Sequence, residues 1–378
     1  AMSDDTLVVG AHGEGAISGA VYVYRYQDSG WYQEAKIKPL TSDGSDFFGA
    51  SVALWGDTLA VGAWGEDSRA AGVGGDEGDN TYTNSGAAYV FTRSGNTWIQ
   101  EAYIKASNPD HSAHFGLAVA LWEDTLAVGA PWEDSGSTGI DGEQTNEGSV
   151  DSGAVYVFIR EGGVWDQRSY IKASNTGNSD NFGASLALFQ DTLAVGAWGE
   201  DSDAVDVDGD ESNDDRNDSG AVYLFERGQQ GFVQDAYIKA SNTGAGDRFG
   251  HAVSLWGDNL AVGAVYEDSD APGLNGNQGS AAATNSGAVY IYSSFTGAWA
   301  LSAYVKASNP DPHDELGYSV ALGHRAMLVG ARWEDSSATA INGTQSDNSR
   351  SNAGAAYLFT IETSGWTQQA YILSLIHI

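Results

Sequence analysis

A segment of about 67 residues recurs along this chain, and this repeat limits the possible folds more than any other feature. The sequence "DTLAVGA" and its close variants mark each copy, and the later copies start 67 residues apart, whereas the first two start 52 apart. A fixed period of this kind is typical of arrays in which every repeat is one supersecondary unit. The copies begin at Asp5, Asp57, Asp124, Asp191, Asp258 and Arg325.

Each repeat contains four short apolar segments in the same order. In the second repeat they are "FGASVAL" (48–54), "DTLAVGA" (57–63), "SGAAYVF" (85–91) and "AYIKASN" (102–108). These segments are too short and too glycine-bounded for helices, and the links "LWGDT" and "FTRSGNTW" predict hairpin turns. Four antiparallel strands per repeat predict an all-β fold, a β-propeller built of four-stranded blades. An extended β-solenoid is the alternative, but its rungs are usually shorter and more uniform.

The two ends of the chain set the expected number of blades. The second, third and fourth segments occur six times and the first only five times, because residues 1–2 align with the tail of a first strand. We therefore expect six blades with an incomplete first blade, and a truncated larger propeller is the alternative. The last six residues, "LSLIHI", depart from the repeat. We assign residues 1–372 to a single propeller and 373–378 to a non-repeat tail of the kind that a cloning scar leaves.

The composition excludes several classes of protein. The 378 residues contain 49 glycines and no cysteine, so disulfides and thiolate metal sites are ruled out. The formal net charge of -34 argues against a nucleic-acid partner, because a polyanion would be repelled. No apolar run is long enough to span a membrane, so we expect no membrane insertion. High acidity suits an extracellular or cell-surface protein that binds cations, although the chain shows no signal peptide.

The repeated motifs resemble those of a known family. "FG", then "GA" or "GAP", then "GAVYVF" is similar to the FG-GAP repeat of integrin α-subunit propellers and their bacterial relatives. The Phe-Gly pairs begin at Phe48, Phe115, Phe182 and Phe249, with Leu316-Gly317 as a variant. The resemblance covers nearly the whole chain and implies the propeller fold, but this fold serves many functions. The integrin calcium loop joins strands one and two, where this chain has only short turns, so those metal residues are not carried over.

Blade topology brings all the long loops to one side. The loop between strands two and three shares a face with the link to the next blade, and both are long and acidic, as in "WGEDSRAAGVGGDEGDNTYTN". We call this side the loop face and expect function there, since long loops on a rigid scaffold usually carry it. A Glu-Asp pair ends strand two in five repeats: Glu66-Asp67, Glu133-Asp134, Glu200-Asp201, Glu267-Asp268 and Glu334-Asp335.

These acids predict calcium sites. Ca²⁺ prefers six to eight oxygen ligands on flexible loops, and loops rich in Asp, Asn, Gly and Ser supply them. Asp206, Asp208 and Asp210 stand at alternate positions in "DVDGDESNDD", like the first half of a calcium loop. The inter-blade links add Asp46, Asp180, Asp247 and Asp314, each two residues before its Phe-Gly or Leu-Gly position.

A structural role for the same acids is the alternative. A Glu-Asp-Ser step after a strand can cap backbone N–H groups or pair with lysine. Lysines recur at one position of strand four and are plausible partners within each blade: Lys38, Lys105, Lys172, Lys239 and Lys306. Capping and metal ligation are compatible.

Aromatic residues precede the acid pairs at the rim of the loop face. Flat rings beside carboxylates suit sugar binding, because a ring packs on C–H faces while acids accept hydroxyl hydrogens. Packing between blades is the alternative role. The candidate ligand-binding residues are Trp64, Trp132, Trp198, Tyr266 and Trp333.

Motifs of catalysis are few. The sequence has no HExxH, GxSxG or P-loop motif, and its histidines, including His12, His114 and His251, do not follow the repeat.

We favour an extracellular recognition or adhesion module that binds a glycan or protein with calcium, as a monomer or an edge-paired dimer. A calcium-dependent hydrolase of esters, lactones or phosphotriesters at the channel and a purely architectural array are the alternatives. Near-identical repeats favour binding or architecture, since an enzyme usually breaks symmetry to build one site.

Overall fold

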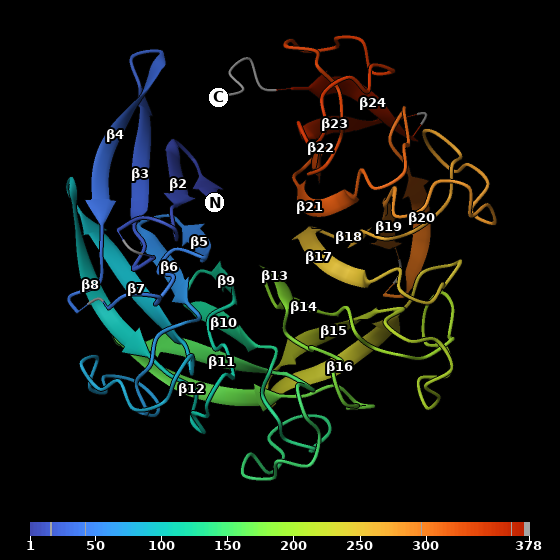
Figure 1. Cartoon of the computed structure of the whole chain (residues 1–378). Helices are drawn as coiled ribbons and strands as arrows, with labels where there is room; N and C mark the ends of the chain where they lie inside the picture. Colours follow the sequence, from blue (N-terminus) through green and yellow to red (C-terminus); the bar gives the residue numbers. More distant parts are fainter. Residues whose placement is uncertain (16, 42, 296, 364, 374–378) are drawn as a thin grey trace. The chain divides into compact units, whose positions relative to one another are not determined.

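The computed structural model describes residues 1–15, 17–41, 43–295, 297–363 and 365–373. Strands account for all of its regular elements, and the described part of the chain contains no helix. The strands form six four-stranded antiparallel sheets, and in each sheet the strands lie side by side in chain order (Figure 1). These sheets are the blades of a β-propeller, as the repeat predicts. Residues 374–378 of the predicted tail lie outside the described residues.

The first three blades differ mainly in the length of their first strand. Blade 1 contains β1 (Met2–Ser3), β2 (Thr6–Gly10), β3 (Val21–Gln27) and β4 (Gly30–Ile37). Blade 2 contains β5 (Ser51–Trp55), β6 (Thr58–Ala63), β7 (Ala87–Ser94) and β8 (Thr97–Ile104). Blade 3 contains β9 (Ala118–Trp122), β10 (Thr125–Ala130), β11 (Ala154–Glu161) and β12 (Val164–Ile171). The two-residue β1 confirms the incomplete first blade.

The last three blades repeat the same order. Blade 4 contains β13 (Ser185–Phe189), β14 (Thr192–Ala197), β15 (Ala221–Gly228) and β16 (Gly231–Ile238). Blade 5 contains β17 (Phe249–Trp256), β18 (Asn259–Ala264), β19 (Ala288–Ser294) and β20 (Trp299–Val305). Blade 6 contains β21 (Leu316–Leu322), β22 (Ala326–Ala331), β23 (Ala355–Glu362) and β24 (Gly365–Ile372).

The chain divides into two compact units, and each is described here by itself. Unit 1 comprises Ala1–Asp191 and Arg227–Val233, and therefore contains blades 1 to 3. Unit 2 comprises Thr192–Glu226 and Gln234–Ile378, and contains blades 5 and 6 with most of blade 4. No helix of membrane-spanning length and hydropathy occurs in the described part of the chain.

Within a unit, the Phe-Gly pair joins each blade to the one before it. Phe115 is fully buried and lies edge-on to Tyr156 of its own blade, at a ring separation of 5.4 Å. Its backbone forms a parallel bridge to Gly86 of blade 2. A Cβ on Gly62 of β6 would lie 1.9 Å from the carbonyl oxygen of Gly116, so this contact requires glycine. The Phe-Gly pair of one blade therefore packs directly against the Gly-Ala pair of the blade before it. We call this contact, formed in blades 2 and 3 by Gly62 and by Phe115-Gly116, the joint.

Candidate functional site

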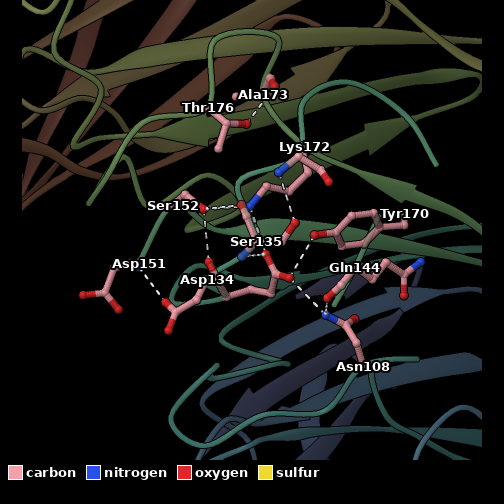
Figure 2. Close-up of polar contacts among 12 residues, drawn as sticks. Asn108, Asp134, Ser135, Gln144, Asp151, Ser152, Tyr170, Lys172, Ala173 and Thr176 are labelled. Atoms are coloured by element: carbon pink, nitrogen blue, oxygen red, sulfur yellow. Dashed lines mark hydrogen bonds and ion pairs between the residues drawn. The ribbon is translucent and has the colours of Figure 1, made fainter. Parts of the chain in front are cut away.

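The glutamate of each acid pair lies inside its own blade. In blade 3, Lys172 Nζ lies 2.9 Å from Glu133 Oε2 and also donates to Ser152 Oγ at 2.7 Å. Tyr170 OH and Asn108 Nδ2 donate to Glu133 Oε1 at 2.9 and 3.0 Å. Figure 2 shows how Lys172, Ser152, Tyr170 and Asn108 converge from different segments. Both carboxylate oxygens therefore have protein partners.

The same ion pair recurs in the neighbouring repeats, which confirms four of the five predicted lysine partners; Lys38 of blade 1 lies 4.0 Å from Glu14 instead. The Nζ–Oε2 distances are 2.6 Å in blades 2 and 4 and 2.8 Å in blade 5. All four lysines are fully buried, and burial lowers the pKa of Lys105, Lys172 and Lys306 while the paired glutamate opposes this shift. A buried charge without its partner is costly, so each pair fixes the local structure. The pairs are Lys105–Glu66, Lys172–Glu133, Lys239–Glu200 and Lys306–Glu267.

Blade 6 lacks the lysine. Leu373 occupies that position and is buried, and Glu334 is only 1% exposed. Asn309 Nδ2 and the Ser336 N–H donate to the two oxygens of Glu334, at 3.0 Å each. Among the residues that the structure describes, no cation forms an ion pair with Glu334. The last blade therefore keeps a buried carboxylate without its counter-charge.

The aspartate of each pair caps a backbone N–H group across its long loop. Asp134 Oδ1 accepts from the Asp151 N–H at 2.7 Å, and the bond spans 17 residues (Figure 2). Bonds of the same span and of 2.7–2.8 Å occur in the other four blades. The caps hold the two ends of each loop together. The capping aspartates are Asp67, Asp134, Asp201, Asp268 and Asp335, and their role as calcium ligands stays a prediction.

The alternating aspartates of blade 4 belong to the fold of its loop. Asp208 has a φ of 53°, in the left-handed region, and its Oδ1 accepts from the Tyr237 N–H at 3.0 Å. Asp206 also has a positive φ, and its carbonyl accepts from the Lys239 N–H. Asp210 Oδ1 accepts from the N–H and hydroxyl of Ser212. Left-handed turns favour Gly, Asn and Asp, which accounts for Asp206 and Asp208. The role of Asp206, Asp208 and Asp210 as calcium ligands stays a prediction.

This loop segment pairs with the outermost strand of its blade. Equivalent residues of successive repeats make the same antiparallel bridge to strand four, from Val73 to Ile104, from Ile140 to Ile171 and from Val207 to Ile238. The left-handed position in this segment is Gly74, Asp141, Asp208, Asn275 or Asn342 in successive blades. The bridge occupies part of an edge that would otherwise expose unpaired backbone groups.

Four aspartates of the inter-blade links are buried. Asp247 accepts from the Gly244 N–H at 3.0 Å, and Asp46 accepts from the Asp43 N–H at 2.7 Å. Burial, reinforced by the negative charge of the nearby acid pair, raises the pKa of Asp247 to about 7 and of Asp46 to about 6. The same causes raise the pKa of Asp314 to about 7. The fourth is Asp180, whose carboxylate accepts from the Gly177 N–H at 2.7 Å.

In blade 3 the acid pair also lines a cavity of about 280 Å³ on the loop face. Its walls are the link residues 108–110 and the loop residues 144–147, and Asp110, Glu133, Asp134 and Glu147 contribute carboxylates. In the described ranges, no three His, Cys, Asp or Glu side chains are grouped closely enough to hold a metal ion. Calcium binding therefore stays a prediction, and this cavity is where we would look for it first.

The rim residues of unit 1 form a continuous chain of contacting rings on the loop face, of which only Phe47 and Trp64 are stacked. Phe47 lies parallel to Trp64 at 4.0 Å, Trp64 contacts His114 at 4.6 Å, and His114 contacts Trp132 at 3.9 Å. His12 lies beyond Phe47, at 6.2 Å. Burial lowers the pKa of His114 to about 4, so its ring is neutral at pH 7. We call Phe47, Trp64, His114 and Trp132 the aromatic arc.

In unit 2, the aromatic rings at the rim pack against arginine side chains. Arg248 lies over the rings of Trp198 and Tyr266, at 4.4 and 5.0 Å from their centres. Arg332 lies over Tyr318 and Trp333, at 4.1 and 4.7 Å. All five rim aromatics predicted from the sequence thus contact a further ring or cation of their own unit.

Comparison with known proteins agrees with this architecture. A family model described as the FG-GAP repeat matches residues 31–91, 98–158, 165–225, 232–292 and 299–359. The chain belongs to the FG-GAP repeat family. FG-GAP repeats are typical of extracellular or surface proteins, and a propeller of such repeats fits a recognition, adhesion or architectural module. A search of curated proteins finds no match to this chain.

The FG-GAP motif also locates a variable position that the sequence analysis did not single out as a set, although it named His114. The residue directly before each Phe-Gly or Leu-Gly pair has a positive φ and lies at the rim, yet its identity changes in every blade. Comparing the repeats position by position reveals this variation, because the neighbouring motif residues hardly change. These residues are Phe47, His114, Asn181, Arg248 and Glu315.

Proposed function

We propose that this FG-GAP chain is an extracellular recognition module that binds a glycan through the aromatic arc of unit 1. The observation that carries the proposal is the contact chain from Phe47 through Trp64 and His114 to Trp132. Trp132 is 41% exposed, and Trp64 is partly exposed. Large rings left at a surface, rather than in the core, are typical of sites that pack on the C–H faces of sugars.

The interlocked blades support the proposal by supplying a rigid base for the arc. Phe47 and His114 precede the buried joint residues Phe48 and Phe115, so their backbone is fixed by the joints. Trp64 follows β6 directly, and Pro131 alone separates Trp132 from β10. Little conformational entropy is lost when a ligand packs on rings that the fold already orients.

The sequence suggested the Glu-Asp pairs as acceptors for the hydroxyl groups of a sugar, but other polar groups suit this role better. The Glu-Asp pairs already accept hydrogen bonds inside the blades. We infer that the cavity beside Asp110, Gln144 and Glu147 supplies the hydroxyl acceptors for a sugar that reaches from Trp132. A protein ligand remains the second class of partner for the same face, and calcium dependence and channel hydrolysis remain predictions.

The test is a glycan array screened with the whole protein, followed by titration of the best ligand. Trp64→Ala and Trp132→Ala should each weaken binding about tenfold, because each removes a large apolar contact. Trp31→Ala is the control, since Trp31 is 47% exposed on β4, outside the arc. Equal affinity of all four proteins would refute the arc as the site. Absence of any ligand would leave the architectural role as the better assignment.

A further inference from the structure

One arginine of unit 2, Arg248, has different surroundings from three arginines of unit 1. Arg25, Arg93 and Arg160 each form an ion pair with an aspartate in a hairpin turn of unit 1: Asp5, Asp57 or Asp124. Arg248 instead lies between Trp198 and Tyr266, and in the described part of the chain no carboxylate forms an ion pair with it. Its charge is therefore not neutralised by a direct ion pair, in a protein whose net charge is -34.

A second arginine and a histidine complete the group. Arg332 lies between Tyr318 and Trp333, and its Nε donates to Glu315 Oε2 at 2.6 Å. Glu315 thus forms an ion pair with Arg332, whereas no carboxylate forms one with Arg248 in the described part of the chain. His251 lies 5.0 Å from the ring of Tyr318, and its Nδ1 is buried without a hydrogen-bond partner.

These groups lie near one another. The positive charges of Arg332 and Arg248 both act on His251 and, together with its burial, lower its pKa to about 4. His251 is also tied to Arg248 by a turn in which its N–H donates to the Arg248 carbonyl at 3.2 Å. Two arginines therefore lie near His251, and one of them, Arg332, is paired with Glu315. The repeat requires neither arginine, since Arg248 corresponds to Phe47, His114, Asn181 and Glu315, and Arg332 corresponds to Trp64, Pro131, Trp198 and Val265.

We propose that this arginine cluster binds the carboxylate or sulfate group of an acidic sugar. The proposal rests on the proposed function, which it narrows to anionic saccharides. Stacking on rings fixes the plane of each guanidinium group, and its N–H edge then matches the two oxygens of an oxyanion. Tyr318 and Trp333, which are 37% and 38% exposed, offer apolar surface to the sugar ring beside that anion.

The net charge of the protein decides which probes are suitable. A long polyanion is repelled by a surface of charge -34, which would hide a local contact. The probes are therefore short: trigalacturonate, a monosulfated disaccharide and a neutral trisaccharide. Each is titrated against the whole protein at pH 7, with tryptophan fluorescence and calorimetry as readouts.

The variants separate local binding from the overall charge. Arg248→Gln should weaken binding of the acidic sugars about tenfold, the usual loss for a hydrogen bond to a charged group. Arg350→Gln is the matched control, since Arg350 is exposed on the long loop of blade 6, and it should change affinity less than about twofold. Arg248→Lys keeps the charge but loses the planar fork, and should lose most of the affinity. Thermal melts of each variant check that the fold is retained.

The results distinguish failure of the arginine cluster from failure of glycan binding. Equal weakening by Arg248→Gln and Arg350→Gln, or full affinity in Arg248→Lys, would overturn the cluster as an oxyanion site. Neutral and acidic sugars of equal affinity would overturn the inference and leave the glycan-binding function standing. Binding of an Asp-rich peptide through Arg248, with no sugar bound, would overturn the saccharide assignment. Failure of every saccharide would count against both proposals.

Discussion

Lys239 Nζ lies 2.6 Å from Glu200 Oε2, and neither side chain is more than 2% exposed to solvent. In blade 6 the equivalent glutamate, Glu334, is equally buried, but Leu373 occupies the position of the lysine. The chain thus contains the same glutamate with and without its cation. This difference allows the ion pair to be tested by one substitution made at two equivalent positions.

Glu200→Gln should destabilise the protein far more than Glu334→Gln. The first change leaves Lys239 buried without a counter-charge and should cost about 3–5 kcal/mol of unfolding free energy. The second leaves no buried cation and should cost about 1 kcal/mol, the usual value of a hydrogen bond. Urea denaturation at pH 7 measures both. Losses of the same size would show that the lysine contributes little.

The FG-GAP joint predicts a position-dependent effect of adding one methyl group. A Cβ on Gly129 would lie 2.0 Å from the carbonyl oxygen of Gly183, a backbone atom that cannot move away alone. Gly129→Ala should therefore cost about 3 kcal/mol or more. Gly330→Ala is the control, because its nearest neighbour is Ser319 Oγ at 2.5 Å, on a side chain that can rotate. Thermal melts compare the two, and a greater loss for Gly330→Ala would contradict the joint.

Asp247 should make stability depend on pH. Burial raises its pKa in the folded protein to about 7, well above the ordinary value of an aspartate, so the folded state binds this proton more tightly than the unfolded state. The resulting stabilisation is complete below about pH 4 and is lost as the pH rises through 7. Asp247→Asn should therefore stabilise the protein at pH 8, by about 2 kcal/mol, and the gain should shrink toward pH 4.

The control for this pH effect is Asp270→Asn, which removes an exposed carboxylate from the same unit. Melts from pH 4 to 8 should show no comparable gain for this variant at high pH. If Asp247→Asn changed stability equally at pH 4 and pH 8, the burial of an ionisable carboxyl group would not be the cause.

Calcium should raise the melting temperature if the loop face binds it. A cation that binds only the folded state stabilises it by about 2.7 kcal/mol at a hundred times its Kd. The melt is recorded in chelator, in millimolar magnesium and in millimolar calcium. Asp110→Asn removes a carboxylate from the blade 3 cavity without touching the buried pair, and should reduce the shift. Identical melts in all three solutions would refute the calcium prediction.

The sequence was sufficient to predict the blades but not the orientation of the acids. Period, strand length and glycine position predict six four-stranded blades because they follow from backbone geometry alone. An aspartate at alternate positions fits both a calcium loop and a left-handed turn, and Asp208 adopts the turn. Only the fold shows that Glu133 points to Lys172 inside the blade, since nothing in the local sequence determines the direction of that side chain.

In each long loop, one segment bridges to the outermost strand of its blade and the rest does not. These two parts of the loop therefore differ in how freely their residues can be substituted. Residues such as 72–74 in blade 2 or 206–208 in blade 4 must keep a backbone that reaches strand four. The residues beyond them make no such bridge. New binding specificities can therefore arise by substitution in the free part of a loop, while the part on the edge continues to protect the blade from pairing with other chains.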